Sequence, residues 1–399
     1  TGATNVNAGT LTVSGGLADT TAVTVASGAT YALGADDAIG SVAGAGNVEL
    51  SSYGLTAGGD NSSTSFSGVM SGTGSLSKAG SGTMTLSGAN TYTGATNVNA
   101  GTLTVSGGLA DTTAVTVASG ATYALGADDA IGTLGGSGDV FLDGSLIIDD
   151  SLDSVSEFSG SLFGEGGIAK IGEGTFYLSG QNLYTGPTDI RFGRIVANSS
   201  LSEFSDLDVS DGATLELGTD SQIASLSGSG DIVLNEYNLA AGSDSDTSFS
   251  GEISGEGALT KIGSGQLNFT GDNTYSGPTE VSSGDLNIEG SMVSVVTCAE
   301  GATSNACGTS DDEPTPQSTP QPTPPSNPPP SNPPPSSPPP SNPPPSNPPP
   351  SSPPPSNPPP SNPPPSNPPP SSPPPSNPPP SSPPPSNPPP SNPPPSNPQ

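Results

Sequence analysis

The segment Gly72–Thr96 reads GTGSLSKAGSGTMTLSGANTYTGAT, and it is the stretch that decides the fold. The phrase returns as GEGGIAKIGEGTFYLSGQNLYTGPT at Gly164–Thr188 and as GEGALTKIGSGQLNFTGDNTYSGPT at Gly255–Thr279. In each copy, short runs alternate apolar with polar residues, and glycine beside serine, asparagine or aspartate closes the run. Period-two alternation between turn residues predicts short, half-buried β-strands joined by tight turns.

The sequence around this phrase is a long internal repeat. Residues 1–40 recur unchanged as residues 93–132, at an offset of 92 residues. A fixed period of this kind is typical of solenoids, in which no single repeat can bury its apolar face alone. Because Thr1 aligns with Thr93, inside the phrase, we expect that the first copy has lost its beginning.

The spacing of apolar residues favours one solenoid over separate domains. Leu11, Tyr31 and Tyr53 recur at intervals of about 20 to 22 residues. We therefore predict an all-β fold, a right-handed parallel β-helix over residues 1–290, with about four coils per repeat and twelve or thirteen coils in all. A string of immunoglobulin-like sandwiches is the rival prediction, since about 90 residues suits one such domain. The regular glycine density argues against it.

The phrase resembles the passenger-associated repeat of autotransporter (type V secretion) proteins. The matching pattern is Gly-x-Leu-x-Lys-x-Gly-x-Gly, then Leu-x-Gly-x-Asn-x-Tyr-x-Gly-x-Thr, then Gly-x-Leu-x-Val, and the second copy departs from it at Ile168 and at 192–195. The resemblance implies a right-handed β-helix that is exported across a Gram-negative outer membrane and displayed at the cell surface. It also implies a carboxy-terminal β-barrel translocator, which we do not find in this sequence.

Composition excludes several classes of function. The chain has 37 acidic and 5 basic residues, a net charge of −32, and no histidine. Such a polyanion repels nucleic acids and anionic membrane surfaces, so we expect neither as a partner and no insertion into a membrane. Without histidine there is no Ser-His-Asp arrangement and no imidazole metal ligand. We predict no catalytic residues, no cofactor and no enzyme activity.

The carboxy-terminal part of the chain has a different composition. Of the 51 prolines, 49 follow Glu313, mostly as Pro-Pro-Pro-Ser-Asn or Pro-Pro-Pro-Ser-Ser units. Proline fixes φ and removes the amide donor, so we predict a disordered or polyproline II stalk over residues 314–399. Residues 291–313 form the junction. They hold Cys298 and Cys307, which we predict to form a local disulfide in a secreted protein.

Three groups of polar residues are candidate sites, each with a structural explanation beside the functional one. Lys78, Lys170 and Lys261 share one repeat position; we expect them four coils apart, meeting local carboxylates or covering apolar surface. Arg191 and Arg194, the only arginines, lie beside Asp189, a combination that carbohydrate-cleaving β-helices use. The third group consists of acidic residues on turns, which could bind calcium: Asp36, Asp37, Asp128, Asp129, Asp149, Asp150, Asp244, Asp246 and the segment Gly135–Asp139.

These observations predict a non-catalytic structural or adhesive passenger at the cell surface or outside the cell, held on a proline-rich stalk. A surface glycan or a protein would be its ligand. Two alternatives remain at this point. One is an extracellular-matrix or cell-wall protein without a translocator, which the algal-type proline repeats suggest. The other is a carbohydrate-active β-helix.

Overall fold

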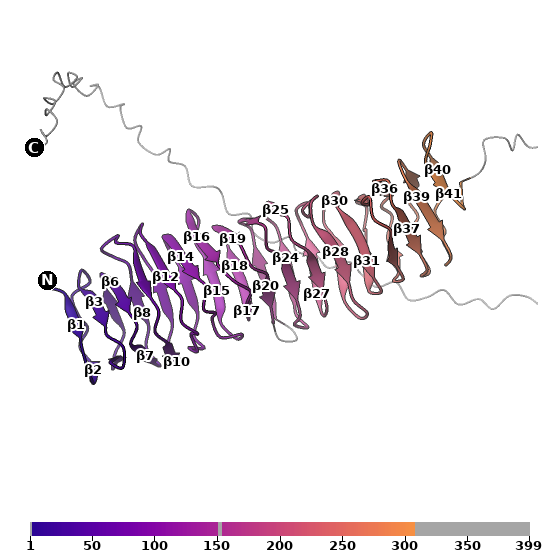
Figure 1. Cartoon of the computed structure of the whole chain (residues 1–399). Helices are drawn as coiled ribbons and strands as arrows, with labels where there is room; N and C mark the ends of the chain where they lie inside the picture. The colour runs from indigo at the N-terminus through magenta and orange to yellow at the C-terminus, as the bar shows by residue number, and fades with distance from the viewer. Residues whose placement is uncertain (1, 151–153, 308–399) are drawn as a thin grey trace, which may run out of the picture. The chain divides into compact units, whose positions relative to one another are not determined.

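The structure, a computed structural model, describes residues 2–150 and 154–307 and is a parallel β-solenoid of about 16 turns without helices. Figure 1 shows the rungs stacked in order from β1 to β41. The predicted fold class is confirmed. The proline-rich stalk predicted from residue 314 lies outside the described residues.

The strands stack on three faces, which we name I, II and III. Face I consists of a ten-stranded sheet that continues, through hydrogen bonds of the segment 199–202, into a five-stranded sheet. Its strands are β1 Thr4–Val6, β3 Ala22–Val25, β6 Ser41–Gly44, β9 Thr64–Phe66, β12 Thr83–Leu86, β14 Gly101–Val105, β16 Ala121–Leu125, β19 Asp139–Leu142, β22 Ser161–Gly164, β25 Asn182–Tyr184, β30 Ser221–Ile223, β33 Leu239–Ala241, β36 Leu259–Lys261, β38 Thr279–Val281 and β40 Val296–Cys298.

Face II begins as a four-stranded sheet. It continues through the hydrogen-bonded segments 90–93 and 108–113 into a ten-stranded sheet. Its strands are β2 Thr10–Val13, β4 Thr30–Leu33, β7 Asn47–Ser51, β10 Met70–Gly72, β17 Asp129–Ile131, β20 Leu146–Ile148, β23 Ile168–Lys170, β26 Thr188–Ile190, β28 Asp206–Val209, β31 Ser225–Gly228, β34 Thr247–Phe249, β37 Gln266–Phe269, β39 Asp285–Ile288 and β41 Thr303–Ser304.

Face III is one twelve-stranded sheet. Its strands are β5 Asp37–Ile39, β8 Leu55–Ala57, β11 Leu76–Lys78, β13 Thr96–Val98, β15 Ala114–Val117, β18 Thr133–Gly136, β21 Val155–Phe158, β24 Thr175–Leu178, β27 Arg194–Ala197, β29 Thr214–Leu217, β32 Asp231–Val233 and β35 Ile253–Ser254.

Each strand forms because its alternate side chains enter the shared core. In β12, Met84 and Leu86 are buried, whereas Thr83 and Thr85 lie on the outer surface. The strand pairs in parallel with β9 and β14, so that Leu86 stacks between Phe66 and Val105. Repetition of this stacking along the solenoid builds one continuous apolar core.

Each turn of the solenoid contains fewer residues than predicted, and this changes the face on which equivalent strands of the repeat lie. Leu125 is in register with Leu142 on the next rung, which is one of the shortest turns, and Gly44 is in register with Phe66, which is one of the longest. Even the longest is shorter than a quarter of the repeat. The prediction of twelve or thirteen coils, four per repeat, was therefore wrong. A 92-residue repeat spans about four and two-thirds turns, because equivalent strands move to the next face: β11 lies on face III, β23 on face II and β36 on face I.

The most regular residues of the phrase lie inside the solenoid. The Tyr92 hydroxyl lies 2.6 Å from Thr96 Oγ1 in the core, and Tyr184 lies 2.6 Å from Thr188 in the same way. Gly94 lies between Tyr92 and Thr96 and has no room for a side chain. A Cβ at this position would overlap the carbonyl oxygen of Gly74 on the preceding rung. The Tyr-x-Gly-x-Thr pattern is therefore explained by packing.

The solenoid continues past the predicted boundary at residue 290. Strand β40 pairs with β38 on face I, and β41 pairs with β39 on face II, so part of the junction forms the last rung. In this rung Cys298 and Cys307 are joined by a disulfide, with their Cα atoms 6.0 Å apart. The bond closes the turn that carries β41.

Candidate functional site

The three lysines lie inside the solenoid. Lys78 is 0% exposed, and its Nζ donates to the carbonyl oxygens of Ala79, Gly80 and Ala100 at 2.8, 2.9 and 3.0 Å. Lys261 is 1% exposed and is held by three carbonyl oxygens at 2.6 to 3.2 Å. Burial lowers the pKa of both lysines. Neither lysine hydrogen-bonds the expected carboxylate, because backbone carbonyls at the chain reversal surround the ammonium, although Asp285 and Asp244 act electrostatically on Lys261.

Lys170 differs from the other two lysines. Its Nζ forms an ion pair with Asp150 and also contacts the carbonyl oxygen of Gly172, and both charged side chains are fully buried. Here the expected local carboxylate is present. All three lysines thus join neighbouring rungs from inside, and none of them faces a ligand.

The repeated acidic pairs fasten one turn to the next. Asp36 Oδ1 accepts a hydrogen bond from the backbone N–H of Gly54 at 2.8 Å, and Asp37 Oδ1 accepts one from Leu17 at 2.8 Å. The identical pair at 128–129 makes the same contacts on another face. These carboxylates substitute for strand pairing at the corners of the solenoid.

The acidic residues on the turns form no cluster, among the described residues, that would support calcium binding. Within the described ranges, no group of three or more histidine, cysteine, aspartate or glutamate side chains could hold a metal ion. The segment Gly135–Asp139 spans a turn, and Asp139 is the first residue of β19. A turn at the entry to β19 therefore accounts for this glycine-rich segment.

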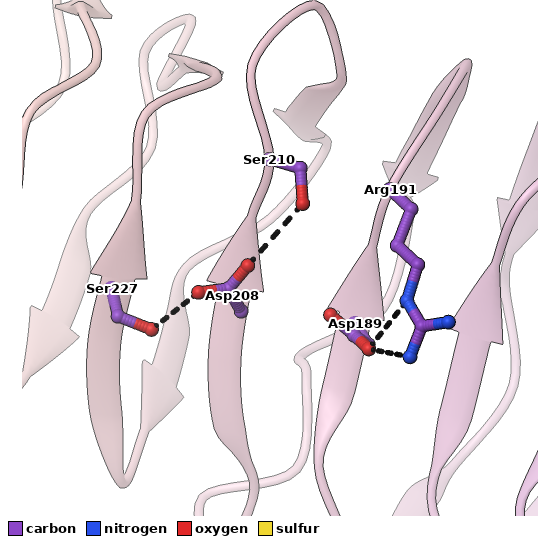
Figure 2. Close-up of polar contacts among 5 residues, drawn as sticks. All are labelled: Asp189, Arg191, Asp208, Ser210 and Ser227. Carbon is purple, nitrogen blue, oxygen red and sulfur yellow. Dashed lines mark hydrogen bonds and ion pairs between the residues drawn. The ribbon is translucent and has the colours of Figure 1, made fainter.

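The arginines lie on the outer surface, as Figure 2 shows for Arg191. Arg191 Nε and Nη2 donate to Asp189 Oδ2 at 2.9 and 2.6 Å. Asp208 stands beside Asp189 on the next rung and accepts a hydrogen bond from Ser227 Oγ at 2.8 Å. Arg194 pairs with a carboxylate of β29. Both arginines are paired with carboxylates and Asp208 is held by serine hydroxyls, as expected for a solvated sheet face.

A surface groove of about 640 Å³ lies where faces III and I meet, across the rungs of β22, β25 and β30. Its wall carries two large exposed apolar side chains, Leu183 (55% exposed) and Phe204 (58%). Serine, glycine, asparagine and glutamine line the rest, with Glu203 as the charged residue among them.

An outward apolar row leads into this groove along face I. Phe141 of β19 is in register with Phe163 of β22, which is in register with Leu183 of β25. The rings of Phe141 and Phe163 pack with centroids 5.3 Å apart. Elsewhere the outer positions are mostly occupied by threonine, serine and charged residues, so we name this row and the groove together the apolar platform. It comprises Phe141, Phe163, Leu183, Phe204, Gln181, Asn182 and Gln222.

The apolar platform was not predicted from the sequence, although differences between the repeat copies indicate it. One repeat earlier, the row of Phe141, Phe163 and Leu183 reads Glu49, Ser71 and Thr91. One repeat later it reads Val233, Ser254 and Thr274. Large apolar residues therefore replace mostly small or polar ones at outer strand positions of one copy only, a difference that packing does not require.

Comparison with known proteins agrees with the repeat architecture. Residues 1–13, 76–105, 168–196 and 259–288 match the passenger-associated-transport-repeat family. The last three of these segments carry the internal Lys, Asn and Tyr–Thr contacts. The repeats and the relatives together support an autotransporter passenger. Autotransporter passengers are displayed or secreted, and this passenger is accordingly a cell-surface or extracellular protein.

Two curated relatives share parts of the passenger. The Adhesin BmaC autotransporter of Brucella suis biovar 1 (strain 1330) is 36% identical over 141 residues, which is 32% of this chain. An Extracellular serine protease of Serratia marcescens is 47% identical over 62 residues, or 16% of this chain. The matches cover 4% and 6% of those proteins. No solved structure is significantly similar. None of the described residues forms a helix that is long and apolar enough to cross a membrane.

Proposed function

We propose that this passenger is a non-catalytic, adhesive rod. The observation that carries the proposal is that its reactive side chains serve the fold. The lysines hold rungs together from inside, the repeated aspartates cap corners, and Arg191 is paired with Asp189. What remains outside is a long, regular and mostly hydroxylated surface, which suits display and contact.

The similarity to an adhesin supports this function more than the similarity to a serine protease does. The protease match spans only 62 residues, and the whole chain contains no histidine for a Ser-His-Asp arrangement. We infer that the two proteins share passenger architecture in this region and not catalytic residues. The charge of −32 opposes contact with anionic partners and self-association.

The proline-rich sequence from residue 314 fits the same function. Its regular spacing of proline with serine and asparagine is typical of solvated spacers. We propose that it holds the solenoid away from the surface that anchors it.

The test compares cells that display the parent protein with cells that carry an in-frame deletion of the codons for residues 1–307. Adherence to host cells or to neighbouring cells should fall several-fold on deletion, while the purified chain should cleave neither casein nor polysaccharides. Unchanged adherence, or cleavage by the purified chain, would contradict the proposal.

A further inference from the structure

The apolar platform is a region where several outward residues depart together from the repeat without a structural need. Three of its side chains, Phe163, Leu183 and Phe204, stand where the preceding copy has Ser71, Thr91 and Thr112. The preceding copy shows that a small polar residue is sufficient for folding at these positions. Exposed large apolar side chains gathered in one place are typical of interaction sites.

In the repeat copy that contains Phe163 and Leu183, an asparagine beside the groove also loses a hydrogen bond that its equivalents accept. In the copy before it, Asn90 Oδ1 accepts a hydrogen bond from Met70 N at 3.1 Å, and in the copy after it, Asn273 does so from Ile253 N at 3.1 Å. In the middle copy the equivalent amide, Leu162 N, instead donates to the carbonyl oxygen of Gln181 at 2.8 Å.

Asn182 is consequently left with an unused acceptor. Its side chain is 7% exposed and lines the groove, and its Nδ2 donates to Ser199 Oγ and Ser200 O. Its Oδ1 is buried and has no donor among the residues that the structure describes. A buried acceptor without a partner costs about 1–3 kcal/mol, so this copy carries a cost beside the groove that the neighbouring copies do not.

Besides serine hydroxyls and the carboxylate of Glu203, the groove has two further neutral amides. Gln181 and Gln222 replace Ala89 and Ala130 of the preceding copy, and each brings an acceptor oxygen and an NH₂ donor to the wall. Such groups pair with hydroxyls in either direction. With the aromatic row beside them, they match a ligand that has an apolar face and a rim of hydroxyls.

We propose that the apolar platform binds a neutral glycan, a proposal that rests on the adhesive function above. Sugar rings would lie with their C–H faces on Leu183 and Phe204 of the groove and on Phe163 of the row beside it. Their hydroxyls would bond to Gln181 and Gln222. The net charge of −32 and the carboxylate of Glu203 act against an acidic glycan.

A second copy of the chain fits the apolar platform less well than a glycan does. Four partly exposed side chains can bury less than half of the roughly 800 Å² per partner that a stable protein interface needs. The charge of −32 on each chain adds repulsion. The same small area suits the stacking of one short oligosaccharide.

The experiment uses the full chain on an array of neutral and acidic glycans. The triple variant Phe163→Ser, Leu183→Thr, Phe204→Thr restores the residues of the preceding copy, and Gln222→Ala does so at a polar position. Phe192→Ala is the matched control, because Phe192 is 56% exposed, also stands where the preceding copy has alanine, and lies outside the groove. Circular dichroism melts establish that each variant folds.

The wild-type chain should bind at least one neutral glycan, the triple variant at least tenfold more weakly and Gln222→Ala several-fold more weakly, with Phe192→Ala unchanged. Binding should change less than about twofold between low and high salt, since a neutral ligand is not screened. The proposal is overturned if no neutral glycan binds, if only acidic glycans bind, or if the triple variant binds like the wild type. It is also overturned if the platform proves to be a self-association surface by light scattering. Cells displaying the triple variant separate the two proposals: adherence that survives loss of the platform leaves the adhesive function standing and removes this site from it.

Discussion

Lys78 and Lys170 occupy the same position of the repeat but lie on different faces of the solenoid. Lys78 is in register with Val98 on face III, and Lys170 is in register with Ile190 on face II. The shift arises because a repeat contains about two-thirds of a turn more than four turns. Residues 1–40 and 93–132 are identical, so each face can accept the same sequence. The cross-section therefore has near three-fold equivalence.

Burial of the lysines predicts their chemical behaviour. Lys78, Lys170 and Lys261 are the only lysines of the chain and are at most 1% exposed. We expect an amine-reactive reagent to label only the amino terminus of the folded chain, and to label all three lysines after unfolding in guanidinium. Peptide mass mapping measures this, and rapid labelling of Lys78 in the folded state would show that its ammonium reaches solvent.

The buried Tyr–Thr contact should contribute measurable stability. Replacing Tyr184 by Phe removes the hydroxyl that lies 2.6 Å from Thr188 Oγ1 and should lower the free energy of unfolding by about 0.5–1.5 kcal/mol. Tyr237→Phe, at a partly exposed tyrosine on the edge of the core, should change it much less. Denaturant titrations compare the two, and equal effects would mean that the internal contact has no special weight.

Close approach of successive rungs makes Gly277 sensitive to substitution. A Cβ at this position would overlap the carbonyl oxygen of Gly257, whereas a Cβ on Gly15 would meet no atom within 4 Å. Gly277→Ala should therefore destabilise the solenoid by at least about 1–3 kcal/mol, as overpacking in a core does. Gly15→Ala should be nearly neutral in the same thermal melts. A neutral Gly277→Ala variant would contradict the tight stacking of these rungs.

Asp129 should give the stability a specific dependence on pH. Burial raises its pKa from 3.8 to about 6, although Leu109 N and the Tyr123 hydroxyl donate hydrogen bonds to it. A raised pKa means that the folded chain favours the protonated acid. Its contribution to stability is full below pH 4 and is lost as the pH rises through 6.

The variant Asp129→Asn removes this titration. The stability of the wild type relative to the variant should fall between pH 4 and pH 6 and stay level above that range. Asp128→Asn, at the exposed neighbour, is the matched control for removal of one carboxylate. A slope that is the same in the wild type and in Asp129→Asn would show that folding does not raise the pKa of Asp129.

The disulfide should protect the last rung. Closing the loop between Cys298 and Cys307 restricts the unfolded chain by about 2.5–3 kcal/mol on the entropic model. Replacing both residues by serine should expose the strands β40 and β41 to proteolysis without loosening the earlier rungs. Limited digestion with mass spectrometry measures this, and mass analysis of the secreted chain tests the bond directly.

The sequence was sufficient to predict the strands, the parallel solenoid and the burial of apolar residues between stacked repeats. Alternation such as that of Met84 and Leu86 in β12 is a local signal, and the glycines mark its ends. The number of turns was not predictable in the same way. The interval from Tyr31 to Tyr53 does not reveal how long each corner is, and corner lengths decide how the repeat wraps around three faces.

The apolar platform was missed for a related reason. Phe141, Phe163 and Leu183 are far apart in the sequence, and only the register of β19, β22 and β25 brings them into one row. The partners of the lysines were also hidden, because the carbonyl oxygens around Lys78 belong to backbone that a sequence does not distinguish.

Cysteine cross-linking tests the wrapping of the repeat most directly. Asn97 is in register with Thr116 on face III, and the identical sequence places Asn5 in register with Thr24 on face I. Adjacent rungs bring such pairs within the Cα separation of about 4.4–6.8 Å that a disulfide spans. The account predicts that Asn97→Cys with Thr116→Cys, and Asn5→Cys with Thr24→Cys, both form disulfides under mild oxidation. If neither pair forms one, and Asn97→Cys instead cross-links to a cysteine at Gly120, each turn takes up a full quarter of the repeat and the three-face placement is wrong.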